Sequence, residues 1–237
     1  PKDLIYNFNR WTTFSDKALY GELTRHVTDK WEITGGARVF WQDFSQRLDQ
    51  TLPICGAFCS TLSPPDAGGT TRANNSNTFH NQIFKLNSSY ELAPSTRIYA
   101  TWSQGFRHGG SNAYPIGQCA FCETSAALIP YKSDKATNYE VGLKGAPGSR
   151  LRYSLSLYRV DWQDIQLDTV LVKSFVPAVV NGKEARSQGA ELELTAQLAN
   201  RLTGTIGYSY TDAKLTSDFV NVQYAGHKGD RLPGVSK

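Results

Sequence analysis

The chain has 237 residues, of which 40% are hydrophobic, 19% are charged and 12% are aromatic, with 20 Gly, four Cys and no Met. This composition argues against wholesale disorder and against a small fold built on disulfides, and no apolar run approaches the roughly 20 residues of a transmembrane helix. The net charge of +4 is mild and no block of basic residues occurs, so we expect no nucleic-acid partner.

Alternation of apolar and polar residues predicts β-strands along most of the chain. In Trp31–Trp41 the odd positions read Trp, Ile, Gly, Ala, Val and Trp, whereas the even positions are mostly polar or small. In chain order, strands are predicted at 17–28, 31–45, 78–92, 96–107, 136–146, 151–165, 187–198 and 202–213, with a weaker one near 3–11. These strands are long enough to cross a bilayer at a tilt, which takes about 9–11 residues.

The connections between the predicted strands alternate between short and long. Short turns with Asp, Asn, Gly or Pro are expected at 28–30, 93–95, 146–149 and 199–201, and long segments at 46–77, 108–135, 166–186 and from 214 onward. This alternation is typical of an outer-membrane barrel with periplasmic turns at one rim and extracellular loops at the other. Trp and Tyr near the strand ends fit its aromatic girdles. The sequence therefore favours an all-β, antiparallel transmembrane β-barrel over a soluble β-sandwich.

The predicted polar faces carry many charges, which a wide lumen can leave hydrated and a narrow one would have to pair. A wide barrel needs more strands than this chain supplies, and an open sheet edge cannot lie in hydrocarbon. The chain also has neither a starting Met nor a signal peptide. We therefore expect it to be an interior part of a longer barrel.

Several segments, in order along the chain, resemble TonB-dependent outer-membrane receptors. They are Ala18–Glu22 with Val27–Trp31, then Tyr99–Asn112, Lys132–Lys144, Asn181–Glu193, Tyr208–Ala213 and Gly229–Pro233. The most specific of them is Asn181–Glu193. The resemblance implies that residues 1–237 form part of a single barrel domain, about eight or nine of its 22 strands. The plug domain and the final strands would lie outside the chain.

This resemblance implies a transporter in the bacterial outer membrane, without enzymatic activity and without a cofactor. Its ligand would be scarce, most often a ferric siderophore, and a TonB energising complex would act through an N-terminal region outside the chain. Outer-membrane lipid and lipopolysaccharide are further expected partners. Two alternatives stay open: a passive porin-like or structural barrel, and a soluble carbohydrate-active β-protein. In the latter, Glu191 and Glu193, roughly 7 Å apart on one strand face, would be the acid and base.

The candidate ligand contacts are basic and aromatic side chains at or near the predicted outer rim, because these suit an anionic, aromatic-rich chelate. They are Arg107, His108, Tyr114, Phe121, Tyr131, Lys132, Lys173 and Phe175. Alternation places Glu140, Glu191 and Glu193 on the lumen side, where the resemblance puts the plug domain. The alternative for these three is a set of solvated lumen charges.

The four cysteines form two local pairs, Cys55 with Cys59 and Cys119 with Cys122. In extracellular loops, local disulfides are the favoured interpretation. Cross-links between the loops stay open, and zinc is disfavoured because 59 residues separate the pairs. Asp161, Asp164 and Asp168 suggest calcium, but alternation puts them on different faces, so we expect neither a metal site nor a catalytic site.

Overall fold

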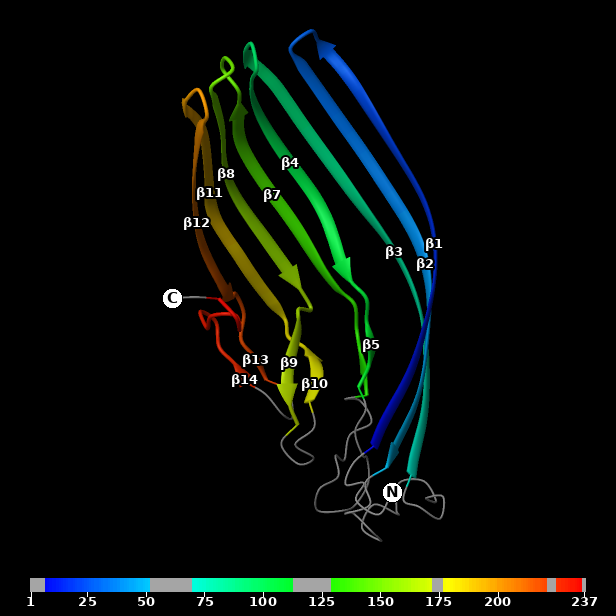
Figure 1. Ribbon diagram of the computed structural model, residues 1–237. Helices are drawn as coiled ribbons and strands as arrows, with labels where there is room; N and C mark the ends of the chain where they lie inside the picture. The colour runs from blue at the N-terminus through cyan, green and yellow to red at the C-terminus, as the bar shows by residue number, and fades with distance from the viewer. Residues whose placement is uncertain (1–6, 52–69, 113–128, 172–176, 221–224, 236–237) are drawn as a thin grey trace.

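The computed structural model describes residues 7–51, 70–112, 129–171, 177–220 and 225–235 (Figure 1). In this part of the chain, eight long strands form one antiparallel sheet, in which each pairs with the next long strand. They are β1 (Asn7–Thr28), β2 (Trp31–Thr51), β3 (Thr70–Ala93), β4 (Thr96–Arg107), β7 (Asp134–Gly145), β8 (Leu151–Gln163), β11 (Glu184–Ala199) and β12 (Leu202–Leu215). No helix of membrane-spanning length and hydropathy occurs among these residues.

The register of the sheet separates an apolar face from a polar face. Trp31 lies opposite Tyr90, which in turn lies opposite Ile98, so these three side chains share one face. One position further along, Glu32 lies opposite Ser89 on the other face. Because side chains alternate along every strand, apolar and polar rows follow each other across the whole sheet.

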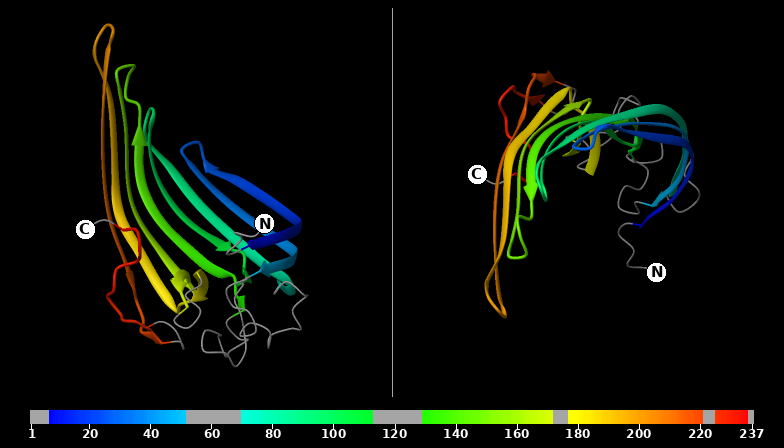
Figure 2. Two further views of the ribbon diagram at one scale, coloured as in Figure 1. Left: turned by 60° about the horizontal axis from the view of Figure 1, so that its bottom comes forward. Right: turned by 90° about the horizontal axis from the view of Figure 1, so that it is seen from above.

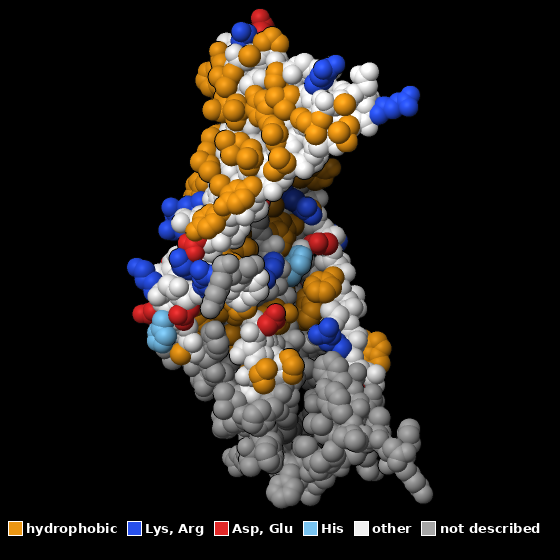
Figure 3. Space-filling view, turned by 60° about the vertical axis from the view of Figure 1, so that its left-hand side comes forward, with side chains coloured by type: hydrophobic (Ala, Val, Ile, Leu, Met, Phe, Trp, Pro, Cys, Tyr) orange, Lys and Arg blue, Asp and Glu red, His pale blue; other side chains and the backbone are white. Residues whose placement is uncertain are grey.

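The sheet is curved but not closed. Seen from the end with the short turns, it forms an arc with β1 and β12 as its edge strands (Figure 2). Figure 3 views the outer side of the arc near β12, where hydrophobic side chains gather over the half with the short turns and charged ones follow below. Leu23, Leu157 and Ile206 on the apolar face are 84%, 54% and 66% exposed. In a water-soluble protein so large an exposed apolar surface would be a liability, whereas lipid solvates it.

The structure confirms the predicted antiparallel strands and short turns, with a few boundary shifts. The segments predicted near 3–11 and at 17–28 form one strand, β1, because residues 12–16 continue the pairing with β2. Strands β2 and β3 run further than expected, to Thr51 and from Thr70, into the segment that was predicted to be a long loop. A crossing needs only about 9–11 residues, so β1 to β3 project beyond the bilayer at the long-loop end.

Short hairpins fill the long-loop end and hold the only hydrophobic core cluster in the described residues. They are β5 (Gly110–Ser111) with β6 (Pro130–Tyr131), β9 (Gln166–Val170) with β10 (Pro177–Asn181), and β13 (Phe219–Val220) with β14 (Ala225–Gly226). Ile165, Leu167, Val180, Leu215 and Phe219 pack together there. The core therefore fixes the rim, while the spanning part of the sheet relies on its backbone ladder and on lipid.

Candidate functional site

Two regions of the polar face form the candidate site: a charged inner wall and an aromatic cluster near the long-loop end. On the inner wall, Glu32 accepts hydrogen bonds from Ser89 Oγ at 2.8 Å and from Arg97 Nη1 at 3.3 Å. Lys85 of β3 forms an ion pair with Glu22 of β1 on the same face. These charges stay partly exposed, as expected for a wall that faces water.

The three glutamates predicted on the lumen side all lie on this polar face. Tyr99 donates a hydrogen bond to Glu140 at 2.6 Å. Glu191 and Glu193 lie further along the face, on β11, opposite small residues of β8, and both are exposed. Their position on the inner wall follows directly from the alternation, whereas contact with a plug domain stays a prediction.

A segment that we call the inward strap, Gln104–Asn112, crosses the polar face at the long-loop end. Pairing of β4 with β3 ends at Ser103, although β4 continues to pair with β7 as far as Arg107. The Phe106 ring stacks on Phe40 of β2 with centroids 4.1 Å apart. Asn75 of β3 donates a hydrogen bond to Ser111 Oγ at 2.6 Å. The strap therefore covers the inner side of the three longest strands.

Under and beside the strap lies the vestibule cluster, which consists of Phe14, Phe40, Phe44, Phe106 and His108. Phe14 contacts both Phe44, at 5.1 Å between centroids, and His108, at 5.9 Å. Phe40 and Phe44 are buried, whereas Phe14 is 56% exposed and presents its ring to the interior. The cluster therefore offers an aromatic surface backed by a packed second layer.

Polar atoms without partners accompany the vestibule cluster. Gln42 Nε2 lies 3.3 Å from His108 Nε2. Five buried side-chain atoms of the described residues have no hydrogen-bond partner, and three of them lie at this cluster: Gln42 Oε1, Gln46 Oε1 and His108 Nδ1. Buried polar atoms are normally satisfied, so unpaired ones in a group are unusual. Because these atoms are buried, a ligand or a water molecule reaches them only when neighbouring side chains move.

A hydrogen-bond network around Asp134 holds the strap in place. The side chain of Asp134 has no exposed surface, and it accepts hydrogen bonds from the backbone N–H of Arg107 at 3.0 Å and from Arg107 Nε at 2.8 Å. The backbone N–H of Gln166 donates to the same carboxylate at 3.2 Å, and Gln166 Nε2 donates to the carbonyl oxygens of His108 and Lys132. Asn181 of β10 also bonds to Lys132 on both its N–H and its carbonyl. One network thus joins the strap, β7, β9 and β10.

The structure places four of the predicted ligand contacts in or beside this network. Arg107 is half exposed but committed to Asp134 and the Gln166 carbonyl oxygen. His108 belongs to the vestibule cluster, Tyr131 pairs with Gly110 in the β5–β6 hairpin, and Lys132 is exposed. The other four, Tyr114, Phe121, Lys173 and Phe175, lie outside the described residues, as do Cys55, Cys59, Cys119 and Cys122.

Of the vestibule cluster only His108 was predicted from the sequence, and Gln42 and Gln46 were not. One signal was present: in Phe40–Gln46 the positions on the predicted polar face read Phe, Gln, Phe and Gln. Two Phe on a face that is otherwise polar indicate that something packs against that face. Asp161, read as part of a weak calcium pattern, instead pairs with Arg159 and Arg186.

A curved antiparallel sheet with an apolar outer face, a polar inner face and loops gathered at one end defines an outer-membrane β-barrel wall. The profile of one family of such proteins, described as "TonB dependent receptor-like, beta-barrel", matches residues 2–237. The chain belongs to this family of outer-membrane receptors. The long-loop end of the sheet is therefore extracellular and the short-turn end periplasmic.

Individual relatives agree with this assignment. The pesticin receptor of Yersinia pestis is 24% identical over 227 residues, which are 96% of this chain and 29% of that protein. The ferrioxamine receptor of Yersinia enterocolitica is 27% identical over 206 residues, covering 86% and 26%. The chain thus spans less than a third of the length of either relative.

Solved structures share the fold. The ferric yersiniabactin uptake receptor of Yersinia pestis superposes with a TM-score of 0.71 at 21% identity, over 97% of this chain and 31% of that one. A copper transporter superposes with a TM-score of 0.61 at 21% identity, over 86% and 31%. Proteins whose names refer to different cargoes therefore share the fold of this sheet.

Proposed function

We propose that the protein imports a scarce metal chelate, foremost a ferric siderophore, across the outer membrane with energy from a TonB complex. The family assignment and the names of the pesticin and ferrioxamine receptors support the general class. The single observation that carries the proposal is the vestibule cluster, because it provides a built recognition surface on the inner wall at the extracellular end.

The chemistry of the cluster favours an aromatic or heterocyclic chelate of low net charge. Phe14 offers an exposed ring. The unpaired amide oxygens belong to Gln42 and Gln46, which flank Phe44 on the same face of β2. Aromatic stacking and single hydrogen bonds orient such a ligand without requiring charge neutralisation. The exposed Lys132, together with the predicted contacts in the long loops, would add charge-assisted contacts at the rim.

Glu140, Glu191 and Glu193 complete the proposal on the inner wall. We assign them to contact with a plug domain through water and hydrogen bonds. The common face of all three and the exposure of Glu191 and Glu193 support this role. The TonB complex would act through that plug and the region that precedes it.

The test is uptake of radiolabelled iron chelates by cells that carry the intact protein, with and without a functional TonB system. The panel contains a hydroxamate, a catecholate and a heterocyclic siderophore, with a copper chelate as a further cargo. We expect saturable uptake of one iron chelate that is lost without TonB. Uptake that persists without TonB would indicate a passive, porin-like barrel and would overturn the proposal.

The vestibule is tested with Phe14→Ala and with Leu19→Ala as the matched control. Leu19 lies on the other face of the same strand and is 73% exposed. Loss of the Phe14 ring is expected to weaken the apparent affinity for the chelate by about tenfold, since an aromatic contact contributes roughly 1 kcal/mol or more. Leu19→Ala is expected to leave it unchanged, and equal effects of both changes would place the site elsewhere.

A further inference from the structure

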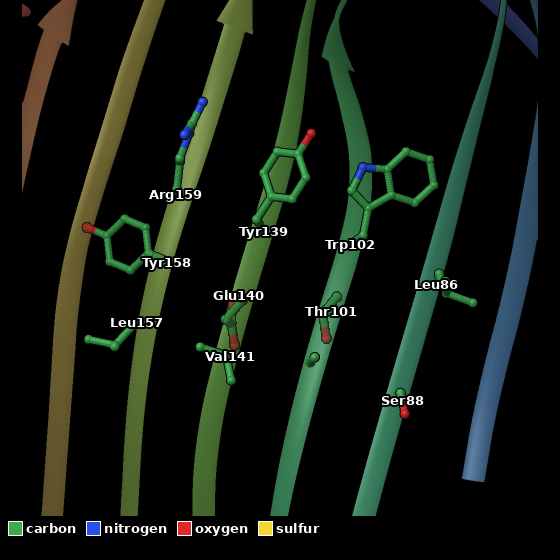
Figure 4. A pocket seen from close by; sticks show the side chains of 11 residues that line it. Leu86, Ser88, Thr101, Trp102, Tyr139, Glu140, Val141, Leu157, Tyr158 and Arg159 are labelled. Atoms are coloured by element: carbon green, nitrogen blue, oxygen red, sulfur yellow. The ribbon is translucent and has the colours of Figure 1, made fainter.

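A shallow apolar groove crosses the outer, lipid-facing side of the sheet over β3, β4, β7 and β8 (Figure 4). It has a volume of about 530 Å³, and its apolar lining includes Trp102, Tyr139, Val141 and Leu157. Arg159 stands at the end of the groove that faces the extracellular loops (Figure 4). The groove therefore combines an apolar floor with a cation at one end.

The register explains why the surface is hollowed at this place. Ser88, Ala100, Val141 and Leu157 form one row across four strands, and the first two of them are small. In the next row toward the loops, Leu86, Trp102, Tyr139 and Arg159 stand side by side. The small side chains of Ser88 and Ala100, next to Leu86 and Trp102 of the neighbouring row, leave the surface hollowed here.

A group of charges that we call the outer-face cation cluster continues from Arg159 toward the loops. It consists of Arg159, Arg186 and Lys214 with the carboxylates of Asp161 and Asp212. Arg159 Nη2 lies 2.8 Å from Asp161, and Arg186 Nε lies 2.7 Å from the same carboxylate. Lys214 pairs with Asp212 at 2.8 Å. Two guanidinium groups thus share one carboxylate, and the cluster itself contains three cations and two anions. The exposed carboxylate of Glu184 and the cation of Lys135 lie on the same face in the next row toward the loops.

The cations are positioned to meet an anion from the membrane. The side chains of Arg159, Arg186 and Lys214 are 48%, 37% and 42% exposed. They lie on the same face as the lipid-exposed band, at or just beyond the row of Trp102 and Tyr139, where interfacial aromatics mark the boundary of the hydrocarbon. Guanidinium groups bind phosphate oxygens in a forked geometry.

We propose that the groove and the outer-face cation cluster form a binding site for one lipopolysaccharide molecule, with an acyl chain in the groove and a lipid A phosphate on Arg159 and Arg186. Three observations select this occupant: the groove is continuous with the lipid-facing band, the cations lie at its extracellular end, and excess positive charge matches a phosphorylated headgroup. The proposal rests on the outer-membrane placement of the sheet and is independent of the imported cargo.

The test measures binding of diphosphoryl lipid A to the intact protein in detergent by native mass spectrometry. Dephosphorylated lipid A and phosphatidylglycerol serve as the other two ligands. We expect diphosphoryl lipid A to bind best, and the double change R159Q/R186Q to weaken it by about tenfold or more. Arg152→Gln, which removes an exposed arginine from the opposite face of β8, is the matched control and is expected to change nothing.

Two further variants separate binding from a merely structural role of the cluster. Asp161→Asn removes the carboxylate that competes with phosphate, so it is expected to strengthen lipid A binding. Ala100→Leu fills the floor of the groove and is expected to weaken binding without any change in charge. Weaker binding by Asp161→Asn, equal binding of phosphatidylglycerol, or unchanged binding by R159Q/R186Q would each overturn the proposal. Heat-modifiable gel migration verifies that every variant is folded.

Discussion

At the scale of single residues, Asp134 shows how one buried charge organises the extracellular rim. Its carboxylate takes hydrogen bonds from the strap and from β9, and its side chain has no exposed surface. Removing one partner of a buried ion pair leaves the other partner and its N–H groups without compensation. The residue therefore decides whether the strap stays on the inner wall.

We expect Asp134→Ala to destabilise the rim by about 2–3 kcal/mol, somewhat less than for a fully buried pair because Arg107 is half exposed. Limited proteolysis of intact cells measures this effect, and the strap should become cleavable while the barrel still assembles. Asp168→Ala, which removes an exposed carboxylate from β9, is the control. Equal resistance of Asp134→Ala and the native protein would refute the assigned role.

Two glycines of the strap are expected to respond differently to the same substitution. A Cβ added at Gly109 would lie 2.6 Å from the Tyr131 carbonyl oxygen and 2.8 Å from the Ser133 nitrogen, so the backbone would have to move. At Gly105 nothing lies within 4 Å. Gly109→Ala should therefore cost about 1–3 kcal/mol, and Gly105→Ala should be close to neutral, as measured by urea unfolding of the intact protein. Equal losses would contradict the packing described for the strap.

Part of this site is predictable from the sequence and part is not. Arg107 and His108 were predicted as ligand contacts because they are basic or aromatic side chains at the end of a long alternating strand. Their partners Asp134 and Gln166 lie 27 and 59 residues away along the chain from Arg107. Such pairs are joined only when hairpins meet in space, and no local pattern encodes them.

At the scale of elements, the periplasmic turns depend on left-handed backbone conformations. Ser95 has a φ of 63° and Gly148 a φ of 71°. This region costs a residue with a side chain roughly 1 kcal/mol or more, whereas glycine enters it freely. Placing Gly at Ser95 and Ala at Gly148 should therefore shift the free energy of unfolding in opposite directions.

We expect Ser95→Gly to raise the free energy of unfolding by up to about 1 kcal/mol and Gly148→Ala to lower it by about 1 kcal/mol. A Cβ added at Gly148 would meet nothing within 4 Å, so the cost of Gly148→Ala comes from the backbone conformation and not from a clash. Urea titration of the intact protein in lipid vesicles checks both values. Destabilisation by both changes would mean that the turns are held by something other than their backbone geometry.

The long strands were predictable because their period of two extends over many residues and one face is strictly apolar. The short hairpins at the rim were not. The β9–β10 pair and the β13–β14 pair contain 5 and 2 residues per strand, and they lie in a region that was predicted only as long loops. Their stability comes from the core cluster around Leu167 and Phe219, whose members are scattered from Ile165 to Phe219 along the chain.

At the scale of the whole molecule, the face of the sheet that meets lipid determines which side chains are available to cargo, plug and membrane. The apolar rows are exposed on the outer side of the arc, and the charged rows line the inner side. Alternation means that neighbouring residues of a strand experience hydrocarbon and water in turn. The positions assigned to the vestibule cluster, the inner glutamates and the lipid site all follow from which face meets lipid.

The most direct test compares Leu155→Arg with Ser154→Arg in β8 of the intact protein folded into lipid vesicles. Leu155 is 42% exposed on the apolar face, whereas Ser154 faces the inner wall opposite Glu193. The free energy of unfolding should fall by about 2–4 kcal/mol for Leu155→Arg, which puts a charge into hydrocarbon, and by no more than about 0.5 kcal/mol for Ser154→Arg. Equal losses, or a larger loss for Ser154→Arg, would contradict the lipid-facing assignment of the sheet.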